Sequence, residues 1–376
     1  MPEYRFDEIA INSKEKKKPT EADKDTYIGL EHLDTGSLKV SRWGSEVAPT
    51  GEKLVMHKGD VLFGKRRAYQ KKVAIAPFDG IFSAHGMVLR PQEAVITKEY
   101  FPLFISSDYF LDAAIKISVG SLSPTINWSD LKELTFQIPT IEEQKRLAPV
   151  IWAAIDTKSA YKKLLLGIDE LVKSQFIEMF GIPESNSLNL LSFKMSDICE
   201  SITDGSHNPP KGLDEISEYY MLSSKNIIDD SITLDNPRYL SKEQFENENK
   251  RTQIKAGDVL LTIVGTVGRS AVVPQNHPNI TLQRSVCVLH PKEEIIDPHF
   301  LFYELKCMQQ FIDSQAQGAA QRGIYLAQVG KLDIVVPEMG LQKQFIEYLQ
   351  QSDKSKFELK QAIDRIDEMI RALMKD

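Results

Sequence analysis

Cysteine is scarce in this sequence, and long apolar runs are missing from it. The three cysteines, Cys199, Cys287 and Cys307, are odd in number and far apart, so they indicate neither a disulfide framework nor a zinc cluster. This usage fits a reducing compartment, and we expect a cytoplasmic protein. No stretch approaches the roughly 18 continuous apolar residues of a membrane helix, and residues 1–10 contain no apolar signal core. The sequence therefore predicts a protein that is neither secreted by that route nor embedded in a membrane.

Motifs that would indicate metal or nucleotide binding are also missing. The seven histidines lack metal-ligand spacing, and Cys287-x-x-His290 alone is more typical of a buried core than of a ligand pair. The segment from Gly59 to Lys65 has the spacing of a phosphate-binding loop, but Arg66 stands where magnesium requires Ser or Thr. Its intervening residues are strand-like, whereas a phosphate cradle needs open loop amides. We therefore expect no metal site and no cofactor in this chain.

Two further segments resemble parts of enzymes without completing a site. Asn208-Pro209-Pro210 is similar to the loop that holds a target adenine in amino-methyltransferases, but Lys211 replaces the aromatic ring that would stack on the base. Gly265-x-x-Gly268 is more typical of a tight turn than of a nucleotide site. No nucleophile elbow occurs in the sequence. The chain is therefore predicted to be non-catalytic.

What the sequence does contain is an internal repeat at an offset of 198 residues. The copies match without a gap at Pro139 and Pro337, at Gln144-Lys145 and Gln342-Lys343, and at Ile168-Asp169-Glu170 and Ile366-Asp367-Glu368. The segments before each copy also match, so the predicted order is domain, helix, domain, helix. A chain of 376 residues is long enough for this. The predicted boundaries are 1–138 for the first domain, 139–182 for the first helix, 183–336 for the second domain and 337–376 for the second helix.

Each copy also carries apolar residues at heptad spacing, which predicts a long helix with an apolar stripe. Lys158 and Lys356 occupy the same place in the two stripes. The residues expected to pair the helices are Ile151, Tyr161, Leu165, Ile168, Val172, Leu359, Ile363, Ile366 and Ile370. A stripe of this length needs a partner, and the matching helix of the same chain can supply it. The alternative is two ordinary amphipathic helices, each packed on its own domain.

The ends of the first helix can be predicted from local signals. Thr140 and Glu143 suit a capping box, and Gly181-Ile182-Pro183 should end the helix. Pro149 lies inside the heptad run and should kink or restart it. Helices of about 35 residues would be roughly 50 Å long, which exceeds one turn of B-DNA. The predicted fold class is α+β, with two similar globular domains separated by two long antiparallel coiled-coil helices in a pseudo-two-fold repeat.

A net charge of -7 argues at first against nucleic acid, but the charge is unevenly distributed. Residues 184–250 contain thirteen acidic and six basic residues, whereas residues 57–72 contain six cations against Asp60 alone. A local basic patch can bind phosphate while the whole chain is acidic. The candidate DNA-binding residues of the first domain are Lys58, Lys65, Arg66, Arg67, Tyr69, Lys71 and Lys72. The alternative is a solvated basic loop without a partner.

The second domain has polar residues on glycine-rich turns, which suit the reading of base edges. The candidates there are Ser206, His207, Lys225, Asn226, Thr266, Arg269, Arg284 and Arg322, with Gln283 and Gln321 beside the last two. Each alone is more typical of a turn or a surface. Their collection on a repeated scaffold favours recognition.

These segments resemble a known family, the specificity (S, HsdS) subunits of type I restriction-modification systems. The resemblance covers nearly the whole chain. Its best motifs are Ile138 to Arg146, which leads into the first helix, and Ser123 to Asn127 before it. Asp60 to Tyr69 is similar to a recurring target-recognition segment, and Asp204 to His207 and Gly265 to Gly268 are similar to others.

The resemblance implies a subunit without an active site that reads a two-part, asymmetric sequence in double-stranded DNA. Each domain would enter the major groove at one half-site, and the paired helices would set the number of unread base pairs. The helices would also dock two modification subunits, which bring S-adenosylmethionine and methylate adenine. Restriction subunits, which use ATP and magnesium, would join where the complex also cleaves.

Two other functions remain open at the level of sequence. The chain could be a scaffold whose tandem domains bind protein and have no role on DNA, or a methyltransferase or nuclease in its own right. The missing motifs disfavour the enzyme. Salt dependence separates the scaffold from the DNA reader, because only phosphate contacts make an affinity fall steeply with salt.

Overall fold

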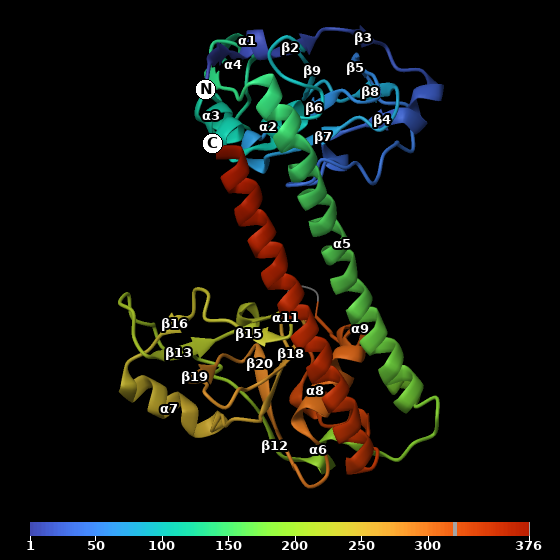
Figure 1. Cartoon of the computed structure of the whole chain (residues 1–376). Helices are drawn as coiled ribbons and strands as arrows, with labels where there is room; N and C mark the ends of the chain where they lie inside the picture. The colour runs from blue at the N-terminus through green and yellow to red at the C-terminus, as the bar shows by residue number, and fades with distance from the viewer. Residues whose placement is uncertain (319–321, 376) are drawn as a thin grey trace. The chain divides into compact units, whose positions relative to one another are not determined.

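The computed structural model describes residues 1–318 and 322–375 (Figure 1). Its contacts divide the chain into two compact units. Unit 1 consists of Met1–Lys163 and Leu359–Asp376, and unit 2 of Leu164–Glu358. Each long helix therefore contributes one part to each unit. The predicted boundaries instead gave each helix a segment of its own.

Unit 1 is built on two four-stranded sheets. The first has the order β2-β9-β6-β7 and the second the order β3-β5-β8-β4. The strands of these sheets are β2 (Ala10–Ser13), β3 (Lys16–Lys17), β4 (Tyr27–Ile28), β5 (Lys53–Met56), β6 (Val61–Phe63), β7 (Val73–Ile75), β8 (Gly80–Phe82) and β9 (Met87–Pro91). The segment of Gly59 to Lys65 contains β6, which is fully buried, so the strand predicted there in place of a phosphate cradle is confirmed.

Short helices and one strand pair complete unit 1. They are β1 (Glu3–Arg5) paired with β10 (Thr135–Gln137), α1 (Phe6–Ile9), α2 (Phe101–Ser106), α3 (Asp108–Lys116), α4 (Trp128–Leu131) and the 3-10 turns Glu21–Thr26, Leu30–His32 and Ala68–Gln70. The core is aromatic. Phe110 lies between Phe6 and Phe136, with ring centroids 5.0 and 5.5 Å away, and all three rings are buried.

Unit 2 repeats this plan. Its main sheet has the order β12-β20-β17-β18, and a three-stranded sheet has the order β16-β13-β19. Their strands are β12 (Cys199–Asp204), β13 (Tyr219–Leu222), β16 (Arg238–Tyr239), β17 (Val259–Thr262), β18 (Ser270–Val272), β19 (Asn279–Leu282) and β20 (Val286–Pro291). The parallel pairing of β4 with β8 in unit 1 recurs as the parallel pairing of β13 with β19, which confirms that the segments before the two helices match.

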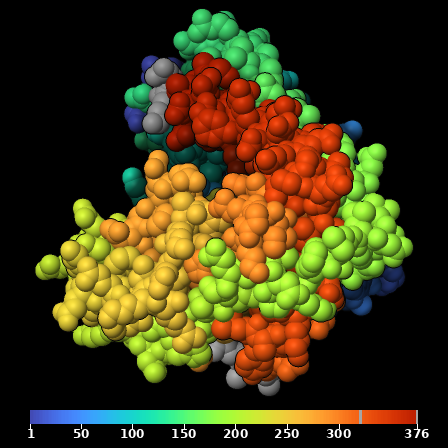
Figure 2. Space-filling view, turned by 90° about the horizontal axis from the view of Figure 1, so that it is seen from below, coloured from blue at the N-terminus to red at the C-terminus, as the bar shows by residue number. Residues whose placement is uncertain are grey.

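The remaining elements of unit 2 surround these sheets. They are β11 (Ser192–Lys194) paired with β21 (Asp333–Val335), the hairpin β14 (Ile227–Ile228) and β15 (Ser231–Ile232), α6 (Met195–Ile198), α7 (Lys242–Thr252), α8 (Pro298–Cys307), α9 (Gln309–Ser314), α10 (Leu326–Val329) and the 3-10 turns Pro183–Ser185 and Ser224–Asn226. Helix α7 is polar and largely exposed, and its region (gold) lies on the surface of unit 2 in Figure 2.

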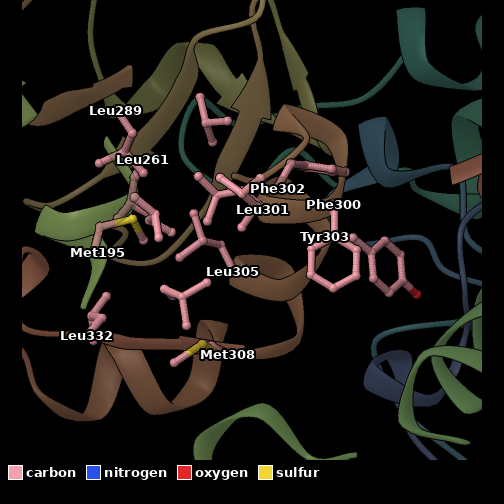
Figure 3. Close-up of a cluster of buried hydrophobic side chains, with 14 of the residues drawn as sticks. Met195, Leu261, Leu289, Phe300, Leu301, Phe302, Tyr303, Leu305, Met308 and Leu332 are labelled. Carbon is pink, nitrogen blue, oxygen red and sulfur yellow. The ribbon is translucent and has the colours of Figure 1, made fainter. Parts of the chain in front are cut away.

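Helix α8 supplies the centre of the unit 2 core. Figure 3 shows Leu301 and Leu305 of this helix packed toward Leu261 of β17 and Leu289 of β20, whereas Phe300 lies on the side away from them. These five residues are fully buried, and the ring centroid of Phe300 lies 5.0 Å from that of Phe180. The helix therefore covers one face of the main sheet and leaves the ends of the strands to the loops.

The two long helices are α5 (Ile141–Phe180) and α11 (Met339–Lys375). In unit 1 the end of α11 lies beside the start of α5 (Figure 1), where Lys158 forms an ion pair with Asp367. In unit 2 the start of α11 lies beside the end of α5, where Lys356 forms an ion pair with Asp169. The antiparallel pairing of the helices is thus present within each unit, as the heptads predicted.

Most of the predicted seam is buried or half-buried. Ile151, Val172 and Ile363 are less than 10% exposed, and Tyr161, Leu165, Ile168, Leu359, Ile366 and Ile370 are half-buried. Continuing the same alternate steps of three and four residues beyond Val172 reaches Gln175 and Met179, but the buried residues near the end of α5 are Phe176 and Phe180. A straight helix drifts by about 20° per heptad relative to a 3.5-residue repeat. The contact face therefore moves on by one residue.

The predicted ends of α5 are confirmed, and the predicted restart is wrong. Thr140 and Glu143 form the capping box, in which each backbone N–H donates to the other side chain, over 2.9 Å from Thr140 and 3.3 Å from Glu143. Gly181 follows the helix with φ +79°. Pro149 lies inside one unbroken helix. Its neighbours Ala148 and Ile151 are buried, and this packing holds the helix together where proline removes one backbone hydrogen bond.

A buried glutamine joins each long helix to the segment that follows the last strand of the main sheet, β9 in unit 1 and β20 in unit 2. Gln144 and Gln342 are both 0% exposed. The amide of Gln342 donates to the carbonyls of Ile295 and Pro337, over 3.1 and 2.9 Å, and accepts from the N–H of Asp297 over 2.8 Å. Gln144 makes the corresponding three hydrogen bonds in unit 1. The repeated Gln-Lys pair of the sequence therefore marks a repeated structural joint.

Candidate nucleic-acid interface

The candidate residues of unit 2 lie on loops that meet at one end of its sheets. Strands β12 and β17 are antiparallel to β20, and β13 is parallel to β19. The loops after β12, β13, β17 and β19 and before β20 therefore leave the sheets at the same end, which we call the unit 2 loop edge. It comprises residues 205–207, 223–226, 263–268 and 283–285, together with residues 322–323, which pair with the loop after β17 through the bridge between Val264 and Gly323.

Hydrogen bonds from backbone N–H groups tie these loops to one another. Ser206 donates to the carbonyl of Leu282 over 2.8 Å and accepts from the N–H of Arg284 over 3.0 Å. The N–H of Ser224 donates to the hydroxyl of Ser285 over 3.0 Å, and the N–H of Gly265 donates to the carbonyl of Arg322 over 3.1 Å. Residues far apart in the sequence are thus held on one surface. Gly265 and Gly268 have φ +85° and +88°, which agrees with the turn predicted there.

Not every candidate of unit 2 is available to a partner. His207, Lys225, Thr266, Arg284 and Arg322 are exposed. Arg322, however, is held by Asp313, with the guanidinium donating to the Asp313 carbonyl over 2.8 Å. Ser206 is half-buried. Gln321 lies outside the described residues.

Two candidates serve their own loop. Asn226 is 2% exposed, and its amide accepts from the N–H of Ser223 over 3.0 Å and donates to the carbonyls of Thr233 and Asp235. This amide is therefore used to hold the loop and is not offered to a base. Arg269 is half-buried and reaches the carbonyl of Ile227 over 3.4 Å.

The structure adds a residue that the sequence did not indicate. Arg251, at the end of α7, forms an ion pair with Asp204 at the end of β12. Asp204 is 5% exposed, and its other oxygen lies 2.7 Å from Nε2 of His207. Because Arg251 and Asp204 are 47 residues apart, no local sequence signal connects them.

Unit 1 has a corresponding loop edge, made of residues 29–33, 64–72, 83–86 and 118–126. The N–H of Ile126 donates to the carbonyl of Lys65 over 2.9 Å, as the N–H of Ile324 donates to Ile263 over 2.8 Å in unit 2. Arg66 donates to the hydroxyl of Ser123 over 3.0 Å and approaches Nε2 of His85 at 3.4 Å. Each unit therefore presents loops at the corresponding end of its own sheets.

Some side chains of the basic segment of unit 1 are exposed on the loop edge, and others are already bound to groups of their own unit. Arg66, Arg67 and Tyr69 are exposed on the unit 1 loop edge, and Arg67 has the left-handed φ of 54°. Lys71 lies 2.7 Å from Asp108 and 2.7 Å from Asp112 of α3. These carboxylates raise the pKa of Lys71 by hydrogen bonding, so its charge is already neutralised within the unit.

The other three lysines also differ from the expectation of one shared patch. Lys72 donates to the carbonyl of Leu30 over 2.6 Å. Lys65 is half-buried, and desolvation, with the nearby charge of Lys16, lowers its pKa. Lys58 lies in the turn before β6, at the opposite end of that strand from Arg66. Only part of the basic run is therefore gathered at the loop edge.

Within residues 1–318 and 322–375, no group of three or more His, Cys, Asp or Glu side chains could hold a metal ion. In the same residues, no helix combines the length and the apolar character needed to cross a membrane.

Comparison with known proteins assigns the family. The model of the type I restriction modification DNA specificity domain matches residues 4–164 and 190–367, which is most of the chain. The chain belongs to this family. The two matched regions correspond to the two copies of the internal repeat, each with its sheets and loop edge.

Named relatives are similar over parts of their length. The specificity subunit of the type I restriction enzyme EcoDI from Escherichia coli is 26% identical over 182 residues, which are 47% of this chain and 40% of that protein. The putative MjaX specificity subunit from Methanocaldococcus jannaschii is 23% identical over 78% of this chain and 72% of that protein. The match to EcoDI thus spans less than half of that subunit.

Solved structures share the fold of this family member. A chain from a study of complex assembly and conformational transition in the type I R-M system has a TM-score of 0.62 at 18% identity, over 100% of this chain and 96% of that one. The S subunit of a type I system from M. genitalium has a TM-score of 0.57 at 15% identity, over 100% and 96%. At such identities the likeness concerns the fold alone.

Proposed function

We propose that this chain is the non-catalytic subunit that gives a type I restriction-modification complex its DNA sequence specificity. Each unit reads one half of a two-part, asymmetric site in double-stranded DNA. The observation that carries the proposal is the loop edge. Each unit gathers polar loops at the corresponding end of its own sheets, and the two edges present different side chains. A repeated scaffold with different loops suits two different half-sites.

The chemistry of the loop edges fits DNA. Arg66 and Arg67 in unit 1 and Lys225 in unit 2 are exposed cations, which suit phosphate contacts that position a protein on the duplex. His207 and Thr266 are exposed polar side chains on the loops of unit 2, which suit hydrogen bonds to base edges in the major groove. The net charge of -7 does not oppose this, because a local potential governs the encounter with DNA.

The long helices support the second part of the proposal. Because α5 and α11 each contribute to both units, the two reading units are joined by helix rather than by a flexible linker. Two modules on such a connection bind one duplex with a shared entropic cost, so the half-sites act as one long site.

The outer faces of the helices offer a place for partner subunits. Leu164 and Leu171 of α5 are 53% and 58% exposed, one heptad apart, and Phe357 of α11 is 60% exposed, all within unit 2. Exposed apolar residues at heptad spacing suit packing against helices of another protein. We propose that they contribute to the docking of two modification subunits, which carry S-adenosylmethionine and methylate adenine.

DNA binding of the chain together with its modification subunits tests the proposal. With six or more phosphate contacts, affinity should fall about a thousandfold or more between 50 and 200 mM salt. A protein-binding scaffold would instead show an affinity for its protein partner that changes little with salt and no preference among DNA sequences. Adenine methylation by the purified chain alone would contradict the non-catalytic assignment.

A further inference from the structure

A single buried carboxylate in unit 2 holds two exposed side chains, one from the loop edge and one from the end of α7. Asp204 is 5% exposed and ends β12. One of its oxygens lies 2.7 Å from Nε2 of His207, and the other is paired with Arg251 of α7. The side chains of His207 and Arg251 are 55% and 54% exposed. A buried acid thus orients two side chains from different elements toward solvent.

The pairing determines which nitrogen of His207 carries the proton. Asp204 accepts a hydrogen bond from Arg251 on one oxygen, and a carboxylate in an ion pair has no proton to donate. Nε2 of His207 must therefore be the donor to the other oxygen, because a histidine tautomer is set by the hydrogen bond its ring makes. In the neutral ring this leaves Nδ1 as an acceptor on a side chain that is more than half exposed.

An acceptor of this kind distinguishes bases in the major groove. Adenine and cytosine present exocyclic amino groups there, as donors, whereas guanine and thymine present acceptors at the corresponding positions. A histidine fixed with Nδ1 as acceptor therefore favours adenine or cytosine on the strand that it faces. Arg251 has no acceptor to offer, but a guanidinium carries five N–H donors, and only one of its nitrogens donates to Asp204. With its side chain 54% exposed, it can still donate to a phosphate oxygen.

We propose that Asp204, His207 and Arg251 form one reading device of unit 2. His207 accepts a hydrogen bond from the exocyclic amino group of an adenine or cytosine, and Arg251 contacts the adjacent phosphate. Asp204 is a positioning residue, which fixes the tautomer of His207 and holds the two side chains together. This inference rests on the proposed function and adds to it the chemical class of the base that His207 reads.

The test uses the complex of this chain with its modification subunits and begins with the DNA site of the unchanged complex. Each adenine and cytosine of that site is then replaced in turn by an analogue that lacks the exocyclic amino group, and binding is measured for the unchanged complex and for His207→Ala. At one position the analogue should weaken the unchanged complex about three- to tenfold, as expected for one hydrogen bond. It should not weaken the variant at that position.

A matched variant controls for general effects. His277 lies before β19, at the end of the sheets away from the loop edge, so His277→Ala should respond to every analogue as the unchanged complex does. If His207→Ala also responds to every analogue as the unchanged complex does, the reading role of His207 is excluded. If the unchanged complex prefers no DNA sequence, it is the proposed function that fails.

Arg251 is tested by its salt dependence. Arg251→Ala should weaken binding to all sequences about equally and reduce the slope of log affinity against log salt by about 1, and Arg251→Lys should restore most of that slope. Lys242→Ala removes the same charge from the other end of α7 and should leave the slope unchanged. An unchanged slope in Arg251→Ala would overturn the phosphate contact.

Discussion

Lys356 and Asp169 form an ion pair across the helices of unit 2, with 3.1 Å between Nζ and Oδ1. Their counterparts 198 residues away, Lys158 and Asp367, form the same pair in unit 1. Helix α5 thus supplies the aspartate in one unit and the lysine in the other. An antiparallel pair of repeated helices produces this reciprocity, because each repeat carries both partners of the pair.

The ion pair of unit 2 should contribute measurably to stability. Lys356→Glu should lower the free energy of unfolding, and adding Asp169→Lys should restore part of it. The side chains are 19% and 51% exposed, so the coupling energy from a double-mutant cycle in urea should be about 0.2–1 kcal/mol. Lys354→Glu makes the same charge change at an exposed position of α11. A coupling energy of zero would remove the ion pair from the forces that align the helices.

The buried amide of Gln342 should contribute more to the free energy of unfolding than the exposed side chains beside it on α11. Gln342→Leu leaves two carbonyls and one N–H without their partner, and we expect a loss of about 2–5 kcal/mol in the free energy of unfolding. Gln344→Leu changes an exposed residue of the same helix and should cost less than about 0.5 kcal/mol. Urea unfolding of both variants checks this, and equal losses would contradict the role of Gln342 as a structural joint.

Glu304 should make the stability of unit 2 depend on pH. It is 0% exposed, and burial raises its pKa to about 8, while Oε1 accepts from the N–H of Val335 over 2.7 Å. The folded state therefore keeps its proton at pH values where the unfolded state, with a pKa near 4.5, has lost it. The free energy of unfolding should fall between about pH 5 and pH 8, by on the order of a few kcal/mol.

Glu304→Gln removes the titrating group and preserves the acceptor for Val335. Its free energy of unfolding should lose this part of the pH dependence, with the largest gain over the original chain near pH 8. Denaturation at a series of pH values measures both proteins. Parallel pH profiles would show that Glu304 titrates alike in the folded and unfolded states.

Arg66 and Arg67 should contribute to DNA affinity through phosphate. Replacing both by alanine should reduce the slope of log affinity against log salt by about 2, since each phosphate contact contributes about 0.9. Lys98→Ala is the control, because Lys98 is exposed but follows β9, at the end of the β2-β9-β6-β7 sheet away from the loop edge. An unchanged slope in the double variant would remove this loop from the interface.

The two long helices could be predicted from the heptad spacing of their apolar residues, whereas the candidate interface could be predicted only in part. The heptads of α5 and α11 and the capping box at Thr140 depend on neighbours three to seven residues away, so local spacing carries them. The burial of Asn226 and the pairing of Lys71 with α3 depend on contacts that no spacing records. Both residues look like polar loop residues in the sequence, and both are used inside their own unit.

The reading device of unit 2 could also be predicted only in part. His207 was predicted from its place on a glycine-containing turn, but its partner Arg251 lies on a polar helix with no motif. The strand order brings them together, because β12 ends beside the start of β20 and α7 packs across β12, β13 and β19. Long-range pairing of this kind is decided by the whole fold.

The most direct test of two reading units held at a set interval is a map of methylated adenines. The map is made in cells that carry this chain with its modification subunits, and again after removal of one heptad from α5 and the matching heptad from α11. A two-part site is expected whose half-sites stay the same while the gap shortens by about three base pairs, since seven residues span about 10 Å of helix. A gap that keeps its original length would contradict the role of the paired helices in setting the interval.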